Sequence, residues 1–197
     1  MSKVVLASSN PGKVAEMQIE LERFGLQIVP QSDYDFPEAI EDGLSFVENA
    51  IKKARHACFH TGLPSIADDS GLEVDALNGA PGIYSARYAN GEGDAANNEK
   101  LLAAMEGQSK RSARYQCVIA FMRHPHDPTP ILCQGSWEGQ IADKPAGANG
   151  FGYDPIFYVP EFDCNAAELD AEQKKTISHR AKALTLLKSS LERGEQP

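Results

Sequence analysis

Residues 65–71 read Ser65-Ile66-Ala67-Asp68-Asp69-Ser70-Gly71, and this stretch is the most informative of the chain. A short apolar run precedes two adjacent carboxylates and a glycine follows them, which predicts that a buried strand ends and turns here. Two like charges at that point repel each other, so a metal ion or a nearby cation is needed to keep both ionised. Such carboxylates can bind Mg²⁺ and activate water, whereas the alternative interpretation is a turn capped by aspartates.

Composition sets broad limits on the class of protein. The chain has 197 residues, of which 42% are hydrophobic and 24% charged, as is typical of an ordinary soluble enzyme. Its net charge of -9 argues against general binding to nucleic acid or to an anionic membrane, although local basic clusters could still bind a phosphorylated small molecule. The cysteines show no CxxC pair and no secretion signal precedes them, so we expect a cytoplasmic protein.

The first half of the chain alternates strand and helix patterns. An apolar run at residues 4–7 predicts a strand, and the apolar residues from Val14 to Phe24 recur at helical spacing after a polar loop. Residues 27–30 predict a second short strand. The S-x-x-E pattern that begins at Ser45 is typical of a capping box, so we expect a helix to start there.

The second half is richer in β-favouring residues. We expect a further strand or hairpin over residues 71–77, a helix over residues 95–105, and a long antiparallel hairpin over residues 113–138. Residues 147–155 form a glycine-rich loop. The last helix is expected from Ser178 to about residue 193.

This order of elements predicts an α/β fold. We expect a mixed, elongated central sheet with packed helices and two lobes that flank a substrate cleft. The sequence contains no internal repeat, low-complexity tract or linker, so a single domain over residues 1–197 is expected.

A polar loop separates the first strand from the first helix. It consists of Ser8, Ser9, Asn10, Pro11, Gly12 and Lys13. Free backbone N–H groups and the helix dipole favour phosphate at this position. The loop is not a P-loop, because it lacks the earlier glycine and has Val14 where Ser or Thr is required. The ordinary interpretation is a strand-to-helix turn with a solvated lysine.

A third acidic group and a lysine lie near the start of the capped helix. Glu41 could share Mg²⁺ with Asp69, because this ion usually takes one or two carboxylates; otherwise Glu41 only favours a helix start. Lys53 follows Asn49 by four residues and therefore lies on the same helix face. If that face borders the cleft, Lys53 is a fixed cation for phosphate, and if not, it is a surface lysine.

The glycine-rich loop contains the aromatic segment Phe151-Gly152-Tyr153-Asp154. A nucleobase can stack on such a ring while polar atoms contact its edge, whereas the alternative is that the aromatics anchor the loop to the core. Lys174, with His179 and Arg180 at the start of the last helix, supplies basic groups that either donate to a base or are solvated.

Together these segments resemble the Ham1-like inosine triphosphate pyrophosphatase family nearly end to end. The matching segments are Ser8-x-Asn10-x-x-Lys13, Glu41-Asp42-Gly43, Ser45-Phe46-x-Glu48-Asn49-Ala50-x-x-Lys53-Ala54, Ala67-Asp68-Asp69-Ser70-Gly71-Leu72, Pro81-Gly82-x-x-Ser85-Ala86-Arg87, Gly150-Phe151-Gly152-Tyr153-Asp154-Pro155 and Ser178-His179-Arg180. Each is a weak signal alone, but all of them in this order are highly specific. Residues 33–40, 89–96 and 161–171 match little.

The resemblance implies that a homodimer hydrolyses non-standard purine nucleoside triphosphates (ITP, dITP, XTP) to the monophosphate and pyrophosphate with Mg²⁺. By the same resemblance, Asp69 would activate water and, with Glu41, bind the metal ion. Asp68 would assist Asp69, and Lys53 would neutralise phosphate charge. The substrate site would consist of Ser8, Ser9, Asn10, Pro11, Gly12, Lys13, Ser70, Phe151, Gly152, Tyr153, Asp154, Lys174, His179 and Arg180.

Base chemistry suggests how ATP would be rejected. Inosine and xanthine carry a carbonyl where adenine carries an amino group, so donors from Arg180 and from loop N–H groups would favour the former. Two alternatives stay open: a Maf-like pyrophosphatase acting on modified pyrimidines, and a non-catalytic nucleotide-binding or sensing module. Pyrophosphate release from a panel of triphosphates distinguishes a Maf-like enzyme from one that hydrolyses ITP and XTP. Binding of ITP without pyrophosphate release would favour the non-catalytic module.

Overall fold

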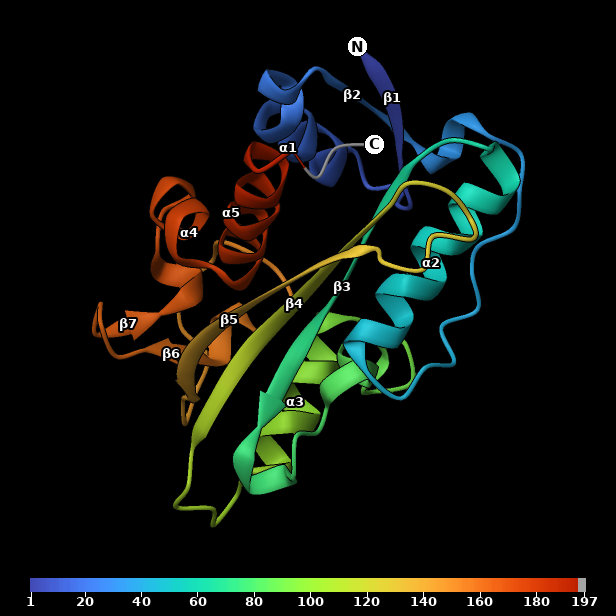
Figure 1. Cartoon of the computed structure of the whole chain (residues 1–197). Coiled ribbons are helices and arrows are strands. Elements are labelled where there is room, and N and C mark those ends of the chain that lie inside the picture. The colour runs from blue at the N-terminus through green and yellow to red at the C-terminus, as the bar shows by residue number, and fades with distance from the viewer. Residues whose placement is uncertain (195–197) are drawn as a thin grey trace. The chain divides into compact units, whose positions relative to one another are not determined.

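The computed structural model describes residues 1–194, which form two compact units (Figure 1). The first unit comprises residues 1–69, 117–134 and the described residues from 183 onward, and the second unit comprises residues 70–116 and 135–182. The chain passes between the units inside helix α5 and inside three strands. These elements are α5 (His179–Glu192), β3 (Ser65–Val74), β4 (Ser112–Met122) and β5 (Ile131–Ile141).

In the first unit the strands follow the order β2-β1-β3-β4-β5. Strand β1 (Ser2–Leu6) runs parallel to β2 (Leu26–Pro30) and to β3. Helix α1 (Pro11–Leu21) connects β1 to β2. Parallel pairing requires such a crossover, and it agrees with the alternation of strands and helices in the sequence.

Helices cover the strands of the first unit. Successive strand residues point to opposite faces. Val4 and Leu6 pack in one cluster with buried residues of α1 and α5, and Figure 1 shows these two helices side by side. Helix α2 (Phe46–Thr61) also contacts β1 and buries its alanine-rich face. The apolar residues expected on the last helix are buried: Leu184, Leu187 and Leu191.

In the second unit the strands follow the order β3-β4-β5-β6-β7. Strand β6 (Phe157–Val159) pairs antiparallel with β5 and with β7 (Cys164–Asn165). Helices α3 (Asp94–Ala104) and α4 (Ala171–Ile177) complete the unit. Its core includes Leu72, Leu101, Met105, Tyr115, Trp137 and Phe157. Short 3-10 turns occur at Glu22–Phe24, Gln31–Asp33, Asp75–Leu77, Gly82–Arg87, Asp154–Ile156 and Ala166–Glu168.

The expected α/β fold with a mixed sheet and packed helices is confirmed. The expected end of a strand at Asp68-Asp69 is wrong, because β3 continues through both carboxylates to Val74. Gly71 is buried and is not among the glycines with positive φ, so it extends the strand instead of turning it. Residues 71–77 are therefore the end of the same strand and one 3-10 turn, not a further hairpin.

Helix α4 was not expected from the sequence. Asp170 caps it, and Gln173 completes a capping box. The sequence pattern D-x-x-Q is typical of such a box. Lys174 therefore belongs to this separate short helix and not to the start of the last one. Within residues 1–194, no helix has both the length and the apolar composition needed to cross a membrane.

Candidate active site

The loop before α1 is an exposed helix amino terminus that Asn10 caps. The Asn10 side chain accepts hydrogen bonds from the N–H groups of Gly12 (2.9 Å) and Lys13 (3.3 Å), while Pro11 occupies the first turn. The Ser8 hydroxyl accepts from the Asn10 N–H group at 3.2 Å. Residues 9–12 are exposed, so the positive end of the helix dipole faces solvent and can receive an anion.

The lysine of this loop is not solvated. Its ammonium group donates to both carboxylate oxygens of Asp68, at 2.9 and 2.8 Å. The Asp68 side chain is only 2% exposed, and a carboxylate buried to that degree requires a partner with opposite charge. Lys13 thus allows the first carboxylate of the acidic pair to remain inside β3.

A second lysine holds the other carboxylate. The Lys53 ammonium group donates to Oδ1 of Asp69 at 2.8 Å and lies 3.5 Å from Oε2 of Glu41. Three of the predicted residues therefore meet at one point, which we call the Lys53 centre. Lys53 is 14% exposed, which rules out the interpretation as an ordinary surface lysine.

Asn49 lies one helical turn before Lys53 and supports the same centre. Its Nδ2 atom donates to Oδ2 of Asp69 at 3.3 Å, and its Oδ1 atom accepts from the Gly43 N–H group at 2.9 Å. A Cβ atom on Gly43 would lie 2.6 Å from that Oδ1 atom, so the close approach requires glycine. Asn49 thereby ties the acidic loop that carries Glu41 to the strand that carries Asp69.

Burial and charge act in opposite directions at the Lys53 centre. Burial raises the pKa of Asp69, and the neighbouring Lys53 ammonium only partly opposes that shift. For Lys53, burial favours the neutral form, but the carboxylates of Asp69 and Glu41 outweigh it and raise its pKa. A carboxylate with increased proton affinity beside a fixed cation is suited to accept a proton.

Glu41 and Asp69 also offer oxygen atoms of the kind that a hard cation binds. Mg²⁺ usually takes one or two protein carboxylates and completes its octahedron with water and phosphate oxygens. The two carboxylates that share Lys53 fit this ion in ligand type and number. Among residues 1–194 there is no group of three His, Cys, Asp or Glu side chains that could hold a metal ion.

In the second unit, Asp154 organises the aromatic loop from inside. Its Oδ1 atom accepts from the Tyr115 hydroxyl at 3.2 Å, and its Oδ2 atom accepts from the Phe151 N–H group at 2.9 Å and from the Lys174 ammonium group. The residue is 1% exposed. Gly150 has φ of 78°, and a Cβ atom there would lie 2.1 Å from Asp154. Asp154 is therefore an internal anchor with both oxygens engaged.

The two aromatic side chains of the loop have different environments. Tyr153 is 3% exposed and its hydroxyl donates to the Ser85 carbonyl at 2.8 Å, so it anchors the loop to the core. Phe151 is 64% exposed, and the Lys174 ammonium group lies 4.9 Å from its ring centroid. Only Phe151 presents a ring on which a planar ligand can stack.

Backbone donors of this loop are used within the protein. Besides the Phe151 N–H group, the Gly152 N–H group donates to Asp94 at 2.7 Å and the Asp154 N–H group donates to the Phe151 carbonyl at 3.3 Å. These groups hold the loop together, whereas the sequence suggested loop N–H groups as donors to a base.

The basic residues at the start of α5 are not exposed. The His179 ring is buried and stacks on Tyr115, with centroids 4.8 Å apart and planes 10° from parallel. Arg180 is half-buried. The interpretation of His179 as solvated is therefore wrong. Because Tyr115 also bonds Asp154, His179 belongs to the same group as the aromatic loop.

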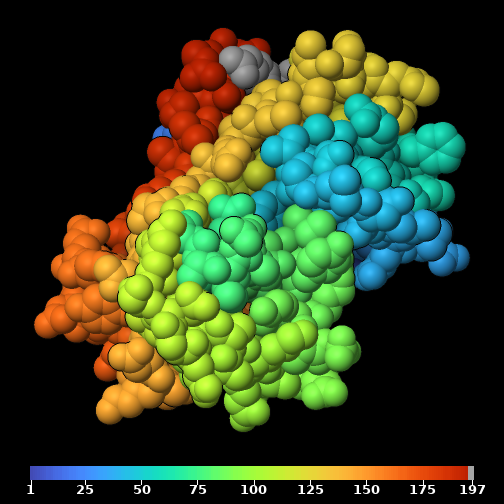
Figure 2. Space-filling model, turned by 90° about the horizontal axis from the view of Figure 1, so that it is seen from below, coloured from blue at the N-terminus to red at the C-terminus, as the bar shows by residue number. Residues whose placement is uncertain are grey.

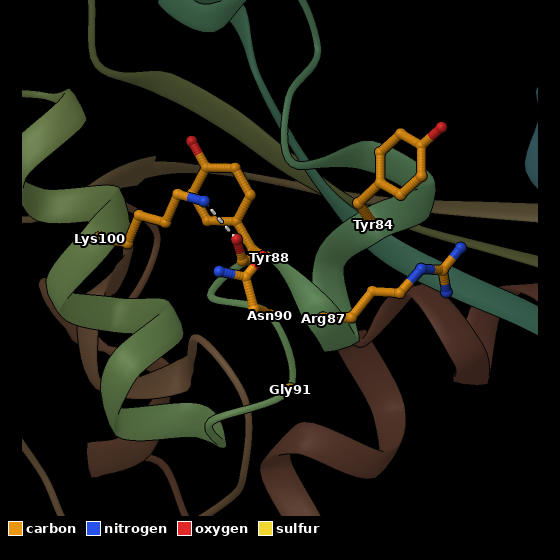
Figure 3. Close-up of a pocket in the computed structure, with 6 residues that line it drawn as sticks. All are labelled: Tyr84, Arg87, Tyr88, Asn90, Gly91 and Lys100. Atoms are coloured by element: carbon orange, nitrogen blue, oxygen red, sulfur yellow. Dashed lines mark hydrogen bonds between the residues drawn. The ribbon is translucent and has the colours of Figure 1, made fainter.

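A pocket of about 640 Å³ lies beside α3 in the second unit (Figure 3). It is lined by Tyr84, Arg87, Tyr88, Asn90, Gly91 and Lys100. Figure 3 shows Lys100 reaching from α3 toward Tyr88, whose carbonyl accepts its hydrogen bond. Arg87 lies 5.2 Å from the Tyr84 ring centroid. None of the site residues predicted by the resemblance lines this pocket.

The predicted residues thus form separate groups. The first unit brings together Lys13 with Asp68, and Glu41 with Lys53 and Asp69. The second unit brings the aromatic loop together with Lys174 and, through Tyr115, with His179. Ser70 is also in the second unit, and its buried hydroxyl has no hydrogen-bond partner among the described residues. The sequence did not identify Tyr115, because no motif contains it. It also did not reveal the supporting role of Asn49, although Asn49 lies inside a motif.

Several known proteins are similar to this chain over nearly its whole length. The dITP/XTP pyrophosphatase of Vibrio cholerae is 58% identical over 98% of both chains, and that of Thioalkalivibrio sulfidiphilus is 57% identical over 96% of this chain and 98% of its own. A HAM1 protein from Coxiella burnetii has a TM-score of 0.95 and 52% identity, covering 98% of this chain and 100% of that one. The Staphylococcus aureus Ham1 protein has a TM-score of 0.92 and 44% identity, covering 99% and 100%. The model of the Ham1 family matches residues 4–190, and the chain therefore belongs to the Ham1 family.

Proposed function

We propose that this Ham1-family chain hydrolyses non-canonical purine nucleoside triphosphates, namely ITP, dITP and XTP, to the monophosphate and pyrophosphate. The observation that carries the proposal is the Lys53 centre, in which one buried ammonium group holds Glu41 and Asp69. The names of the relatives, dITP/XTP pyrophosphatases, support the same substrates. Removal of such nucleotides keeps deaminated purines out of the nucleotide pool.

The reaction needs a water molecule aligned with the α-phosphorus. Asp69 accepts a proton from that water, since burial gives its carboxylate a raised pKa and Asn49 fixes its orientation. The water oxygen forms a bond to the α-phosphorus while the bond from phosphorus to the bridging α-β oxygen breaks. Pyrophosphate leaves with the electron pair of that bond, and Lys53 offsets the negative charge that develops.

Glu41 and Asp69 would hold Mg²⁺, because their carboxylate oxygens suit this ion in type and number. When bound, this ion supplies charge neutralisation on the phosphate oxygens and a lower pKa for the attacking water. Residues 8–13 bind the triphosphate at the amino terminus of α1, where exposed backbone and the helix dipole favour an anion. Lys13 contributes a further cation, and Asp68 keeps it in place.

In the second unit the exposed ring of Phe151 stacks on the purine, with Lys174 fixed beside it. Arg180 and His179 supply polar groups for the 6-carbonyl oxygen, and the unpaired hydroxyl of Ser70 contacts the substrate. Asp154 acts through the shape of the loop. A site built on hydrogen bonds to a carbonyl group penalises the amino group of ATP, because two donors would then face each other.

We propose further that residues 1–197 act as one catalytic domain, that the protein is a homodimer, and that it works in the cytoplasm. The family match over residues 4–190 spans both units, which supports a single functional domain. Light scattering at several protein concentrations tests the oligomeric state, with the mass of a dimer as the expected result.

A substrate panel tests the proposal. Purified protein is incubated with Mg²⁺ and ITP, dITP, XTP, ATP or GTP, and the products are separated. We expect monophosphate and pyrophosphate from the first three, with a kcat/KM at least about 100-fold above that for ATP. Release of phosphate and a diphosphate would contradict the assigned bond. Tight ITP binding without turnover would instead favour a non-catalytic sensing module.

A further inference from the structure

Helix α3 holds the aromatic loop by two side chains that the proposed reaction does not use. Asp94 Oδ2 accepts the Gly152 N–H group at 2.7 Å, and Asn98 Nδ2 donates to the Gly152 carbonyl at 2.9 Å. The two residues are four positions apart and therefore lie on one face of the helix. Consequently α3 fixes the peptide group before Gly152 and the peptide group after it.

A third contact fixes the next residue of the loop. The Tyr153 hydroxyl donates to the Ser85 carbonyl, and the Ser85 hydroxyl accepts from the Leu72 N–H group at 2.9 Å and donates to the Gly82 carbonyl at 2.6 Å. The contacts from Ser85, Asp94 and Asn98 come from residues 82–98, whose green atoms form a continuous surface in Figure 2. This segment forms a clamp on the loop.

The clamp restrains the backbone that follows Phe151. Because Phe151 is 64% exposed, core packing does little to orient it, and its direction depends on the peptide groups on its two sides. The Asp154 carboxylate accepts the Phe151 N–H group, and the Asp94 carboxylate accepts the Gly152 N–H group. Gly152 has φ of 63° and no side chain, so the hydrogen bond from its N–H group to Asp94 and the one from Asn98 to its carbonyl restrain the backbone there.

The surroundings of Asn98 indicate that its side chain holds the aromatic loop. It is 8% exposed, its Nδ2 atom bonds Gly152, and its Oδ1 atom has no hydrogen-bond partner among the described residues. The neighbouring Asn97 is also buried, at 2% exposed, but its amide bonds the Ala89 N–H group and the Ala86 carbonyl. Asn97 supports the helix and its preceding segment, whereas Asn98 acts on the loop.

We propose that Asp94 and Asn98 are positioning residues that fix the Phe151 ring and so hold the purine where Arg180 and His179 can discriminate between its 6-substituents. The inference rests on the proposed function, since it concerns the same loop. It assigns a role to residues of α3 and its first turn, a region in which sequence reasoning had found no site.

The test compares variants that remove a hydrogen-bond partner of Gly152 with one that keeps it. Asn98→Asp removes the donor, and Asp94→Ala removes the acceptor, whereas Asp94→Asn keeps an acceptor oxygen for the Gly152 N–H group. We expect the first two variants to raise the KM for ITP about 10-fold and to lower the ITP to ATP ratio of kcat/KM by a similar factor, with kcat within about 2-fold of the native value. Asp94→Asn should restore near-native constants.

Asn97→Ala is the matched control, because it also removes a buried asparagine from α3. We expect it to lower the melting temperature without changing the ITP to ATP ratio. If the native protein hydrolyses ITP but both Asn98→Asp and Asp94→Ala leave the ITP to ATP ratio of kcat/KM unchanged, this inference is wrong while the proposed function stands. No ITP hydrolysis by the native protein would overturn the proposed function first. If Asn98→Asp does not fold, the comparison of Asp94→Ala with Asp94→Asn decides.

Discussion

Each unit buries a carboxylate beside a lysine, but the two carboxylates differ in the hydrogen bonds that they accept. In the first unit, Asp69 is bonded by Lys53 and Asn49, has a raised pKa, and shares its lysine with the partly exposed Glu41. In the second unit, Asp154 is 1% exposed and both oxygens are engaged by neighbours from the loop, from β4 and from α4. Asp69 accepts one hydrogen bond on each oxygen and has a raised pKa, which suits it to proton transfer, whereas the three donors around Asp154 hold the shape of the loop.

The largest effect should follow from Asp69→Asn. The amide keeps the shape of the side chain but cannot accept a proton or bind a cation as a carboxylate does, so we expect kcat to fall about 1,000-fold. Circular dichroism should show a folded chain. The control is Asp42→Asn, which removes an exposed carboxylate that lies next to Glu41 and pairs with Lys52, and it should leave kcat near native. Near-native turnover in Asp69→Asn would remove that residue from both assigned roles.

The same substitution at Asp154 should lower the stability of the fold much more than the turnover. Asp154→Asn leaves Lys174 without its counter-ion and weakens the bond to Tyr115, so we expect a loss of about 3 kcal/mol in the free energy of unfolding. Urea unfolding measures it. Turnover at saturating ITP should change far less than in Asp69→Asn. A variant as stable as the native protein but without turnover would show that Asp154 takes part in the chemistry.

Asp127 sharpens the comparison because it is a fully satisfied carboxylate within the first unit. Arg123 binds both of its oxygens, at 2.8 Å each, and lowers its pKa below the usual range. Its contribution to stability is therefore present above the unfolded-state pKa of about 4 and is lost as pH falls through the lower folded-state value. We expect Asp127→Asn to lose about 2 kcal/mol at pH 7 and progressively less below pH about 4. A pH-independent difference would contradict this account.

The smallest effect concerns the exposed ring of the second unit. Phe151→Ala should raise the KM for ITP about 10-fold through lost stacking, with kcat little changed, whereas Phe151→Tyr keeps a stacking face and should be near native. Steady-state kinetics on ITP measures both. Equal KM values for the alanine and tyrosine variants would show that the ring does not contact the base.

Local patterns in the sequence predicted much of the fold. The S-x-x-E pattern placed the start of α2, and the spacing of Lys53 from Asn49 put both on one helix face. The same patterns failed at Asp68-Asp69, because the lysine that allows Asp68 to stay inside β3 lies 55 residues away in sequence. The spacing of apolar residues along the chain does not show an ion pair between residues that are so far apart in sequence.

The candidate site was predictable only where a motif marked it. Motifs identified Glu41, Lys53 and Asp69, which do meet. The supports of the aromatic loop come from distant segments, since Tyr115 is 39 residues from Asp154 and Asp94 is 58 residues from Gly152. Such contacts depend on tertiary packing, and composition gives no signal for them.

Hydrolysis of ITP in ¹⁸O-labelled water tests the central claim most directly. Attack at the α-phosphorus, with Asp69 as the proton acceptor, places the labelled oxygen in the monophosphate and none in pyrophosphate. Mass spectrometry of the two products distinguishes these positions, and Asp69→Asn should show almost no incorporation over the same time. Label in the pyrophosphate, or undiminished incorporation by the Asp69→Asn variant, would contradict the account.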